Sequence, residues 1–342
     1  MFAESDADVG TTSLAFHEID TANKRLLRQP VRRSPYNKVR EAVVNEIEKL
    51  TNANIARPST SPLASPVVMV RKKDSGWRMC VDYRRLNSIT KFDCFPLPHL
   101  NEALDAFAGA TVISSLDLAM AYHQVPIKHV DVEKTGFITH VGLFKMMKMP
   151  FGLCNAPSTY QRLMTSVLQG LLGRICIAYL DNVIVVSKRH ADHVANLKAV
   201  FERIRAAGLK LKPAKCNLFC EQVLYFGHVV SSAGINPDPA KLRVFADWPV
   251  PITVRELQFF FGFVNFYCDF IDEQTALTAC LYDLTASCKG TEQVHFTTVH
   301  LKRFNEIKRR LCAAPRLAHA NLDAPFTLYT DVLNIRVGAV LL

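Results

Sequence analysis

Two acidic side chains stand where apolar, strand-like runs of the chain end. Asp117 follows the run VISSL, and Asp181 with Asn182 separates the runs IAYL and VIVV. Phosphoryl transfer uses two cations that clamp the attacking and leaving oxygens, and Mg²⁺ prefers carboxylates together with substrate phosphates. An acid at a strand end and another at a neighbouring hairpin tip could therefore hold such cations. By spacing alone, a polar turn is the commoner meaning of Asp181–Asn182.

The elements around these acids are strands, hairpins and helices. Residues 110–127 begin as a strand that carries Asp117, and residues 176–187 have the pattern of a β-hairpin. Pro157 to Leu172 is expected to be helical, since proline suits a first helical turn. His190 to Ala207 is an amphipathic helix by its apolar spacing.

The rest of the chain mixes strands and helices without a regular β-α-β alternation. The residue patterns predict helices over 37–50, 239–247, 253–270 and 302–311, and hairpins over 66–83 and 326–342. On the helix over 253–270, the spacing places an aromatic stripe on one face and predicts core packing: Phe259, Phe263, Phe266, Tyr267 and Phe270. This mixture favours an α+β fold.

Composition narrows the function classes. The chain has 342 residues, about two ordinary domains, and Lys plus Arg exceed Asp plus Glu to give a net charge of +10. Such an excess indicates a polyanionic partner, most often nucleic acid, although a merely basic protein has the same charge. The ten cysteines are scattered without zinc-site spacing, and we expect reduced thiols. The acidic, polar N-terminus does not have the pattern of a signal peptide, and no apolar run is long enough to span a membrane.

Several motifs, in order, carry a resemblance to a known family. The segments SSLDLAMAYHQVPI, MPFGLCNAPSTYQRLM and YLDNVIVVS follow one another. They are flanked by IARPSTSPLASPVVMVRKKDSGWRMCVDYRRLN and LKPAKCNLFCEQVLYFGHVVSSAGINPDPAKL. Together they resemble the reverse transcriptases of gypsy-type long-terminal-repeat retrotransposons, from about residue 17 to the C-terminus. The resemblance implies a right-hand polymerase fold of fingers, palm and thumb.

The resemblance also implies roles for individual residues. Asp117, Asp181 and the backbone carbonyl of Leu118 would hold two Mg²⁺ ions, with Mn²⁺ as a substitute, and Asn182 would complete the catalytic hairpin. The nucleotide-binding residues would be Lys72, Arg78, Tyr122, Phe151, Gly152 and Gln161. Of these, Tyr122 would lie beneath the incoming sugar and exclude a 2′-hydroxyl. Without the motif order, Lys72 could be only a hairpin tip, Tyr122 and Phe151 core aromatics, and Arg78 a partner stacked on Trp77.

The chain departs from the family pattern at the hairpin. The family normally carries a second aspartate where this chain has Asn182. Asparagine suits the turn as well as aspartate does, so we expect the fold to survive. One negative charge beside two divalent cations is lost, so we expect strongly reduced catalysis.

The C-terminal segment FTLYTDVLNIRVGAVLL resembles the first hairpin of the ribonuclease H domain that follows reverse transcriptase in this family. Asp331 would be its first catalytic aspartate. Since one carboxylate cannot hold two metals, we expect no ribonuclease H activity from this chain. The expected domains are a linker over 1–36, fingers and palm over 37–232, thumb and connection over 233–289, and a truncated ribonuclease H-like segment over 290–342.

Two functional interpretations stay open. The first is an RNA-directed DNA polymerase, a nucleotidyltransferase that extends a primer on an RNA or DNA template with deoxynucleoside triphosphates. The second is a catalytically inactive nucleic-acid-binding remnant or scaffold of the same fold, which Asn182 favours. Either would be intracellular, in a cytoplasmic particle or the nucleus, without a membrane partner. The residues leave the oligomeric state open.

Overall fold

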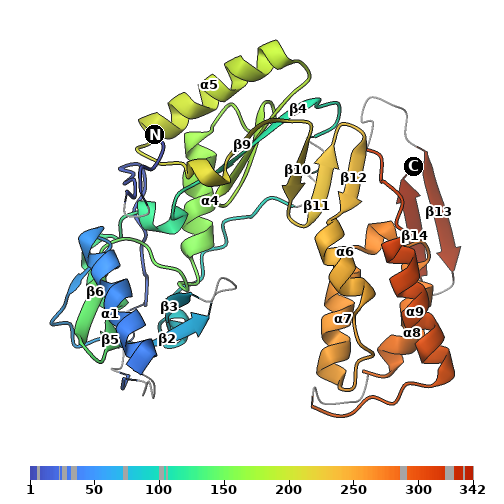
Figure 1. Cartoon of the computed structure of the whole chain (residues 1–342), viewed down its shortest axis with the longest axis horizontal. Helices are drawn as coiled ribbons and strands as arrows, with labels where there is room; N and C mark the ends of the chain where they lie inside the picture. Colours follow the sequence, from blue (N-terminus) through green and yellow to red (C-terminus); the bar gives the residue numbers. More distant parts are fainter. Residues whose placement is uncertain are drawn as a thin grey trace. The chain divides into compact units, whose positions relative to one another are not determined.

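The computed structural model describes residues 1–5, 8–22, 24, 29–31, 37–71, 76–99, 104, 107–285, 291–319, 327–333 and 336–341. The chain divides into two compact units (Figure 1). The first comprises Met1–Ala106 and Thr111–Cys220, and the second comprises Phe107–Ala110 and Glu221–Leu342. The thumb expected from residue 233 onward therefore shares a unit with the strands just before it. The functional domain limits remain predictions.

The first unit begins with a sheet of the expected fingers region. Its strand order among the described residues is β1-β6-β5-β2-β3. The strands are β1 (Ala56–Pro58), β2 (Ser65–Arg71), β3 (Trp77–Val81), β5 (Phe137–Thr139) and β6 (Gly142–Met146), accompanied by helices α1 (Asn37–Asn52) and α2 (Arg84–Asn87). The predicted hairpin over 66–83 is confirmed, because β2 and β3 pair antiparallel with Val70 opposite Arg78.

The second sheet of this unit carries both candidate acids. Its order is β7-β8-β4-β9. The elements are β4 (Val112–Asp117), β7 (Cys176–Tyr179), β8 (Asn182–Ser187), β9 (Asn217–Cys220) and the short 3-10 helices η1 (Ala121–Gln124), η2 (His129–Thr135) and η3 (Pro213–Lys215). Helix α4 (Ala156–Val167) contacts β7, and α5 (His190–Ala206) contacts β8.

Local sequence accounts for the bounds of these helices. Proline lies in the first turn of α4, as predicted, but the helix ends at Val167 rather than Leu172. The following Gly170 and Gly173 adopt φ of +79° and +72°, a conformation that glycine accepts and a helix excludes. On α5, His193 is fully buried between the hydroxyls of Ser114 and Ser187, at 2.7 and 2.8 Å from its ring nitrogens.

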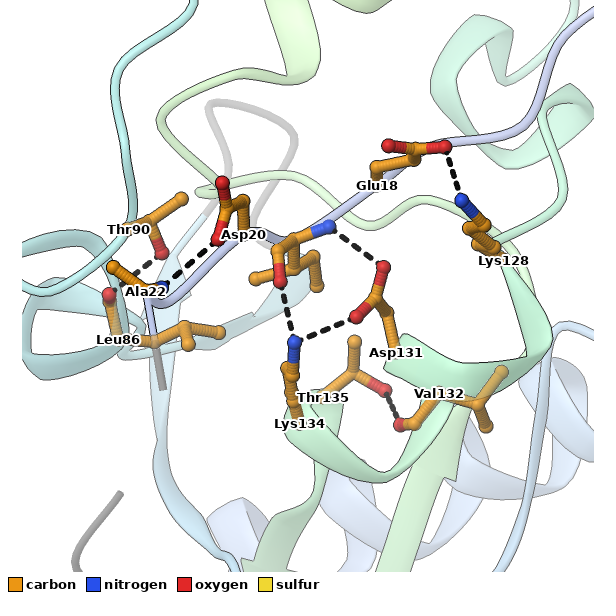
Figure 2. Close-up of polar contacts among 11 residues, drawn as sticks. Glu18, Asp20, Ala22, Leu86, Thr90, Lys128, Asp131, Val132, Lys134 and Thr135 are labelled. Carbon is orange, nitrogen blue, oxygen red and sulfur yellow. Dashed lines mark hydrogen bonds and ion pairs between the residues drawn. The ribbon is translucent and has the colours of Figure 1, made fainter. Parts of the chain in front are cut away.

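The N-terminal residues pack on the first unit. Figure 2 shows the side chains of Asp131 and Lys134, which form hydrogen bonds with the backbone of this segment. The Asp131 carboxylate accepts from the Ile19 N–H at 2.9 Å, and the Lys134 ammonium donates to the Ile19 carbonyl at 2.6 Å. His17 and Ile19 are each 1% exposed. Part of the expected linker over 1–36 is therefore buried, and the limit at residue 36 stays a prediction.

The second unit combines two small sheets with four described helices. The sheets are β10 (Gln222–Tyr225), β11 (His228–Ser231) and β12 (Gly234–Pro237) in that order, and β13 (Leu328–Leu333) paired with β14 (Arg336–Leu341). The helices are α6 (Pro239–Ala246), α7 (Val254–Phe266), α8 (Gln274–Asp283) and α9 (Thr298–Cys312), with η4 (Cys268–Phe270) following α7. The predicted terminal hairpin is confirmed, whereas α8 was not predicted.

Helix α7 corrects the expectation for the aromatic stripe. Thr253 and Glu256 form a capping box that fixes where α7 begins. The core of this unit is formed by Phe260, Val264 and neighbours from α6 and α9, whereas Phe259 and Phe266 are 61% and 43% exposed. The stripe prediction was wrong for these two residues, because the packed helices cover a different face of α7.

The state of the cysteines and the presence of membrane-spanning helices can be examined across the described residues. Their cysteines are all free thiols. Within the same ranges, no helix is long and apolar enough to cross a membrane.

Candidate active site

Asp117 and the Asp181–Asn182 turn meet at one end of the second sheet. The antiparallel register of β4 and β8 places Asp117 directly opposite Asn182. The Leu118 N–H donates to the Asp181 carbonyl at 3.1 Å, which ties the end of the first strand to the turn. The predicted hairpin is confirmed, but Leu180 rather than Asp181 adopts the left-handed conformation, with φ +52°.

The electrostatic environment of Asp181 includes the charge of Asp117. Burial raises the pKa of Asp181, and the negative charge of Asp117 raises it further, while Lys215 opposes both. A half-buried carboxylate beside a second carboxylate is stabilised by a nearby cation. Among the described residues, however, no group of three or more His, Cys, Asp or Glu side chains could hold a metal ion. Opposite Asp117, Asn182 provides an amide rather than a third acid.

The Gln161 side chain forms hydrogen bonds with the backbone of the hairpin. This side chain on α4 is 2% exposed. Its amide nitrogen donates to the Ala178 carbonyl at 3.0 Å, and its amide oxygen accepts from the Leu180 N–H at 2.8 Å. Both polar atoms are therefore engaged with the backbone on the N-terminal side of the turn. The nucleotide contact expected for Gln161 stays a prediction.

An aromatic cluster lies beside the acids. The ring of Tyr122 is 4.9 Å from that of Phe151 and 5.6 Å from that of Tyr160, measured between centroids. Burial raises the pKa of Tyr122, with a further contribution from the charge of Asp181. Phe151 is 60% exposed, so it is not a core aromatic. The next residue, Gly152, has φ +93°, where an L side chain would be strained.

The basic residues of the fingers hairpin are only partly described. Arg78 is exposed on β3. The guanidinium stacked on Trp77 belongs to Arg71, with 5.2 Å from its central carbon to the ring centroid, so the stacking alternative was placed on the wrong arginine. Lys72 lies outside the described residues. The side chain of Asp331, on β13, is also outside them.

Lys215 was not predicted from the sequence. Its ammonium lies 3.3 and 3.2 Å from the two carboxylate oxygens of Asp117. The two residues are 98 positions apart, so no local pattern could have paired them. The sequence contained a weak signal, because Lys215 falls within a motif that carried the family resemblance.

The second unit presents a basic and aromatic face on α7, to which α6 contributes Lys241. The Arg255 guanidinium lies over the exposed ring of Phe259 at 5.8 Å, and the Lys241 ammonium over that of Phe266 at 5.3 Å. Gly262 lies between Phe259 and Phe266 on the helix, and a methyl group added there would have no other heavy atom within 4 Å. Cations with exposed aromatic rings are typical of surfaces that bind nucleic acid.

Known families match two regions of the chain. Residues 70–230 match the family described as reverse transcriptase (RNA-dependent DNA polymerase), and residues 296–342 match the RNase H-like domain found in reverse transcriptase. Residues 70–230 are therefore a reverse transcriptase domain.

The curated relatives are Pol polyproteins of transposons. The chain is 34% identical over 316 residues to the retrovirus-related Pol polyprotein from transposon opus of Drosophila melanogaster, covering 89% of this chain and 32% of that protein. It is 32% identical over 318 residues to that of transposon gypsy, covering 89% of this chain and 31% of that protein. The Tf2-7 polyprotein of Schizosaccharomyces pombe is 31% identical over 325 residues, covering 95% of this chain and 24% of that protein. The chain spans about a third or less of these relatives.

Solved structures share the fold. The foamy viral protease-reverse transcriptase in complex with an RNA/DNA hybrid matches with a TM-score of 0.85 and 22% identity, covering 96% of this chain and 44% of that chain. The same viral protein with double-stranded DNA matches with a TM-score of 0.88 and 21% identity, covering 97% of this chain and 69% of that chain. The predicted α+β polymerase fold is confirmed.

Proposed function

We propose that this chain is the polymerase part of a retrotransposon Pol polyprotein, and that it extends a primer with deoxynucleotides on an RNA or DNA template. One observation carries the proposal. The register of β4 and β8 and the bond from Leu118 to the turn bring Asp117 and Asp181 to one end of the sheet. Two carboxylates that are far apart in the sequence and meet at one end of a sheet are suited to hold the metal ions of phosphoryl transfer.

The donor set suits Mg²⁺ or Mn²⁺. Both ions take hard oxygen ligands, commonly one or two carboxylates completed by substrate phosphates and water. Asp117 and Asp181, with the Leu118 carbonyl, would hold them, and the pKa of Asp181 is already raised partly by the charge of Asp117. Bound there, the ions would neutralise charge on the transferring phosphoryl group. The Asn182 amide adds no charge to this set.

The chain's own residues would orient the nucleotide. The Tyr122 ring, supported by Phe151 and Tyr160, would form the floor under the sugar and leave no room for a 2′-hydroxyl. Arg78, exposed on β3, would bind the triphosphate, for which a guanidinium offers paired donors. Gln161 would keep the turn in place beneath the reacting atoms.

The template-primer would contact the basic and aromatic face of α7. Phe259 and Phe266 offer exposed rings, and Arg255 and Lys241 offer charges for phosphates. The net charge of +10 supports a polyanionic partner.

An inactive nucleic-acid-binding protein of the same fold is the second candidate. One observation favours it. Asp117 faces an amide across the strands rather than a carboxylate, so one of the usual charges at the metal site is absent.

Primer extension on an RNA template separates the two candidates. The unmodified chain is compared with Asn182→Asp and Asp117→Ala, first with Mg²⁺ and then with Mn²⁺. Extension by the unmodified chain that Asp117→Ala abolishes supports an active polymerase. Extension by Asn182→Asp alone supports an assembled site disabled by one missing charge. If none of the three extends the primer while each still binds it, the polymerase proposal is wrong and the binding role is favoured.

A further inference from the structure

Lys215 forms an ion pair with a residue that the proposed function assigns to metal binding. Its ammonium nitrogen contacts both oxygens of Asp117, at 3.3 and 3.2 Å. The Asp117 side chain is 16% exposed and that of Lys215 is 58% exposed. The pair therefore joins a largely buried carboxylate to a cation that reaches it from the solvent side.

The backbone holds Lys215 at this position. The Lys212 N–H donates to the Asp117 carbonyl at 2.9 Å, so the segment before the lysine is bonded to the end of β4. The Lys215 N–H in turn donates to the Lys212 carbonyl at 3.0 Å, within the short helix η3. Two successive hydrogen bonds thus link the backbones of Asp117 and Lys215. They hold the lysine backbone close to the aspartate, so that the ion pair can form.

The side chains at this point carry one net negative charge. Asp117 and Asp181 contribute two negative charges, Lys215 contributes one positive charge, and Asn182 contributes none. Burial raises the pKa of Asp181, and the charge of Lys215 opposes that rise. A divalent cation that binds Asp117 must compete with this ammonium, so whatever stabilises the ion pair is subtracted from the affinity for the metal.

We propose that Lys215 is a built-in counter-cation that competes with divalent metal for Asp117 and lowers the metal affinity of the site. The proposal rests on the assignment of Asp117 as a metal ligand. It gives Lys215 a positioning role in which it keeps Asp117 oriented and neutralised when no metal is bound.

The test measures binding of Mn²⁺ alone to the full chain, without nucleic acid or nucleotide, from the loss of the free-ion signal in electron paramagnetic resonance. Lys215→Met removes the charge and keeps the side-chain length, and Lys215→Arg keeps the charge. Lys198→Met on α5 is the matched control, because Lys198 is an exposed lysine on another element. Asp117→Asn shows which part of the binding belongs to this site.

We expect Lys215→Met to bind Mn²⁺ about three- to tenfold more tightly than the unmodified chain at low salt. Lys215→Arg and Lys198→Met should bind as the unmodified chain does. Lys215→Met should have no effect in the Asp117→Asn background. Unchanged or weaker binding by Lys215→Met, while Asp117→Asn still lowers binding, overturns the competition and leaves the metal site intact.

A second background keeps the test decisive if the unmodified chain binds too weakly to measure. Asn182→Asp adds a charge to the site, and Lys215→Met should tighten binding in it by the same factor. If Asp117→Asn does not lower Mn²⁺ binding in either background, the metal assignment itself is refuted together with the role of Lys215. Circular dichroism confirms that each variant is folded.

Discussion

Asp117 on β4 and Asn182 on β8 face each other across an antiparallel strand pair, at the point where both strands reach the turn. A carboxylate at position 182 would therefore place like charges directly opposite each other. Such pairs destabilise a sheet by up to about 1 kcal/mol. We therefore expect the asparagine to make the metal-free hairpin more stable and its affinity for a divalent ion weaker.

Asn182→Asp should lower the thermal stability of the metal-free chain and make it depend more steeply on Mg²⁺. The added charge repels Asp117 without metal, and the bound ion reverses the repulsion. Thermal unfolding with and without Mg²⁺ measures both effects. Asn236→Asp on β12 is the control, since Asn236 faces Val229 rather than an acid. Equal Mg²⁺ responses in the two variants would contradict the expectation.

Gln161→Ala should destabilise the chain by about 2–4 kcal/mol. The change leaves the Leu180 N–H and the Ala178 carbonyl without their buried partner, and each such loss costs about 1–3 kcal/mol. Urea unfolding measures the free energy of unfolding of each variant. The exposed Gln169 beyond the same helix provides a matched Gln169→Ala control, expected to change stability by less than about 0.5 kcal/mol. A similar small effect at both positions would show that Gln161 does not hold the hairpin.

Phe259→Ala and Phe266→Ala should each weaken binding of a primer-template about five- to tenfold with little effect on folding. Both rings are exposed on α7 beneath a cation, and a stacked base contributes about 1–3 kcal/mol. Fluorescence anisotropy gives the dissociation constants. Leu224→Ala on β10 removes an exposed apolar side chain outside α7 and serves as control.

The charges of the same face should appear in the salt dependence. Lys241→Gln should reduce the slope of log affinity against log salt by about one, because one phosphate contact is lost. An unchanged slope, or equal losses for Leu224→Ala and the two phenylalanine variants, would argue against this face.

His17 should make the chain less stable in mild acid. Burial lowers the pKa of His17 to about 4 from its ordinary 6.5. The unfolded chain therefore binds more protons than the folded chain between these values, and stability falls as the pH drops from about 6.5 to 4. One such histidine contributes up to about 1.4 kcal/mol per pH unit in that window.

Urea unfolding at pH 7, 6 and 5 measures this dependence. His17→Asn should flatten it, whereas His99→Asn, at an exposed position, should not. An unchanged slope in His17→Asn would mean that the N-terminal segment is not docked through this residue. His123, whose pKa burial also lowers to about 4, accounts for part of the slope that remains.

The parts of the fold that were predicted correctly have local causes. Strands around Asp117 and Asp181 and the helix beginning at His190 follow from the spacing of apolar residues, which shows in any short window. The order of the motifs was enough to indicate the reverse transcriptase family. The resemblance to this family also implied that Asn182 stands where a second aspartate is usual.

Tertiary structure decided everything that depends on which surfaces meet. Helical spacing alone cannot say which face of α7 is covered, so Phe259 was expected in the core and is exposed. The pairing of Lys215 with Asp117 spans 98 positions, and the contacts of Gln161 depend on how α4 lies under the hairpin. A sequence specifies the pattern of each element, but a buried contact forms only when two elements are packed, and its partner is known only then.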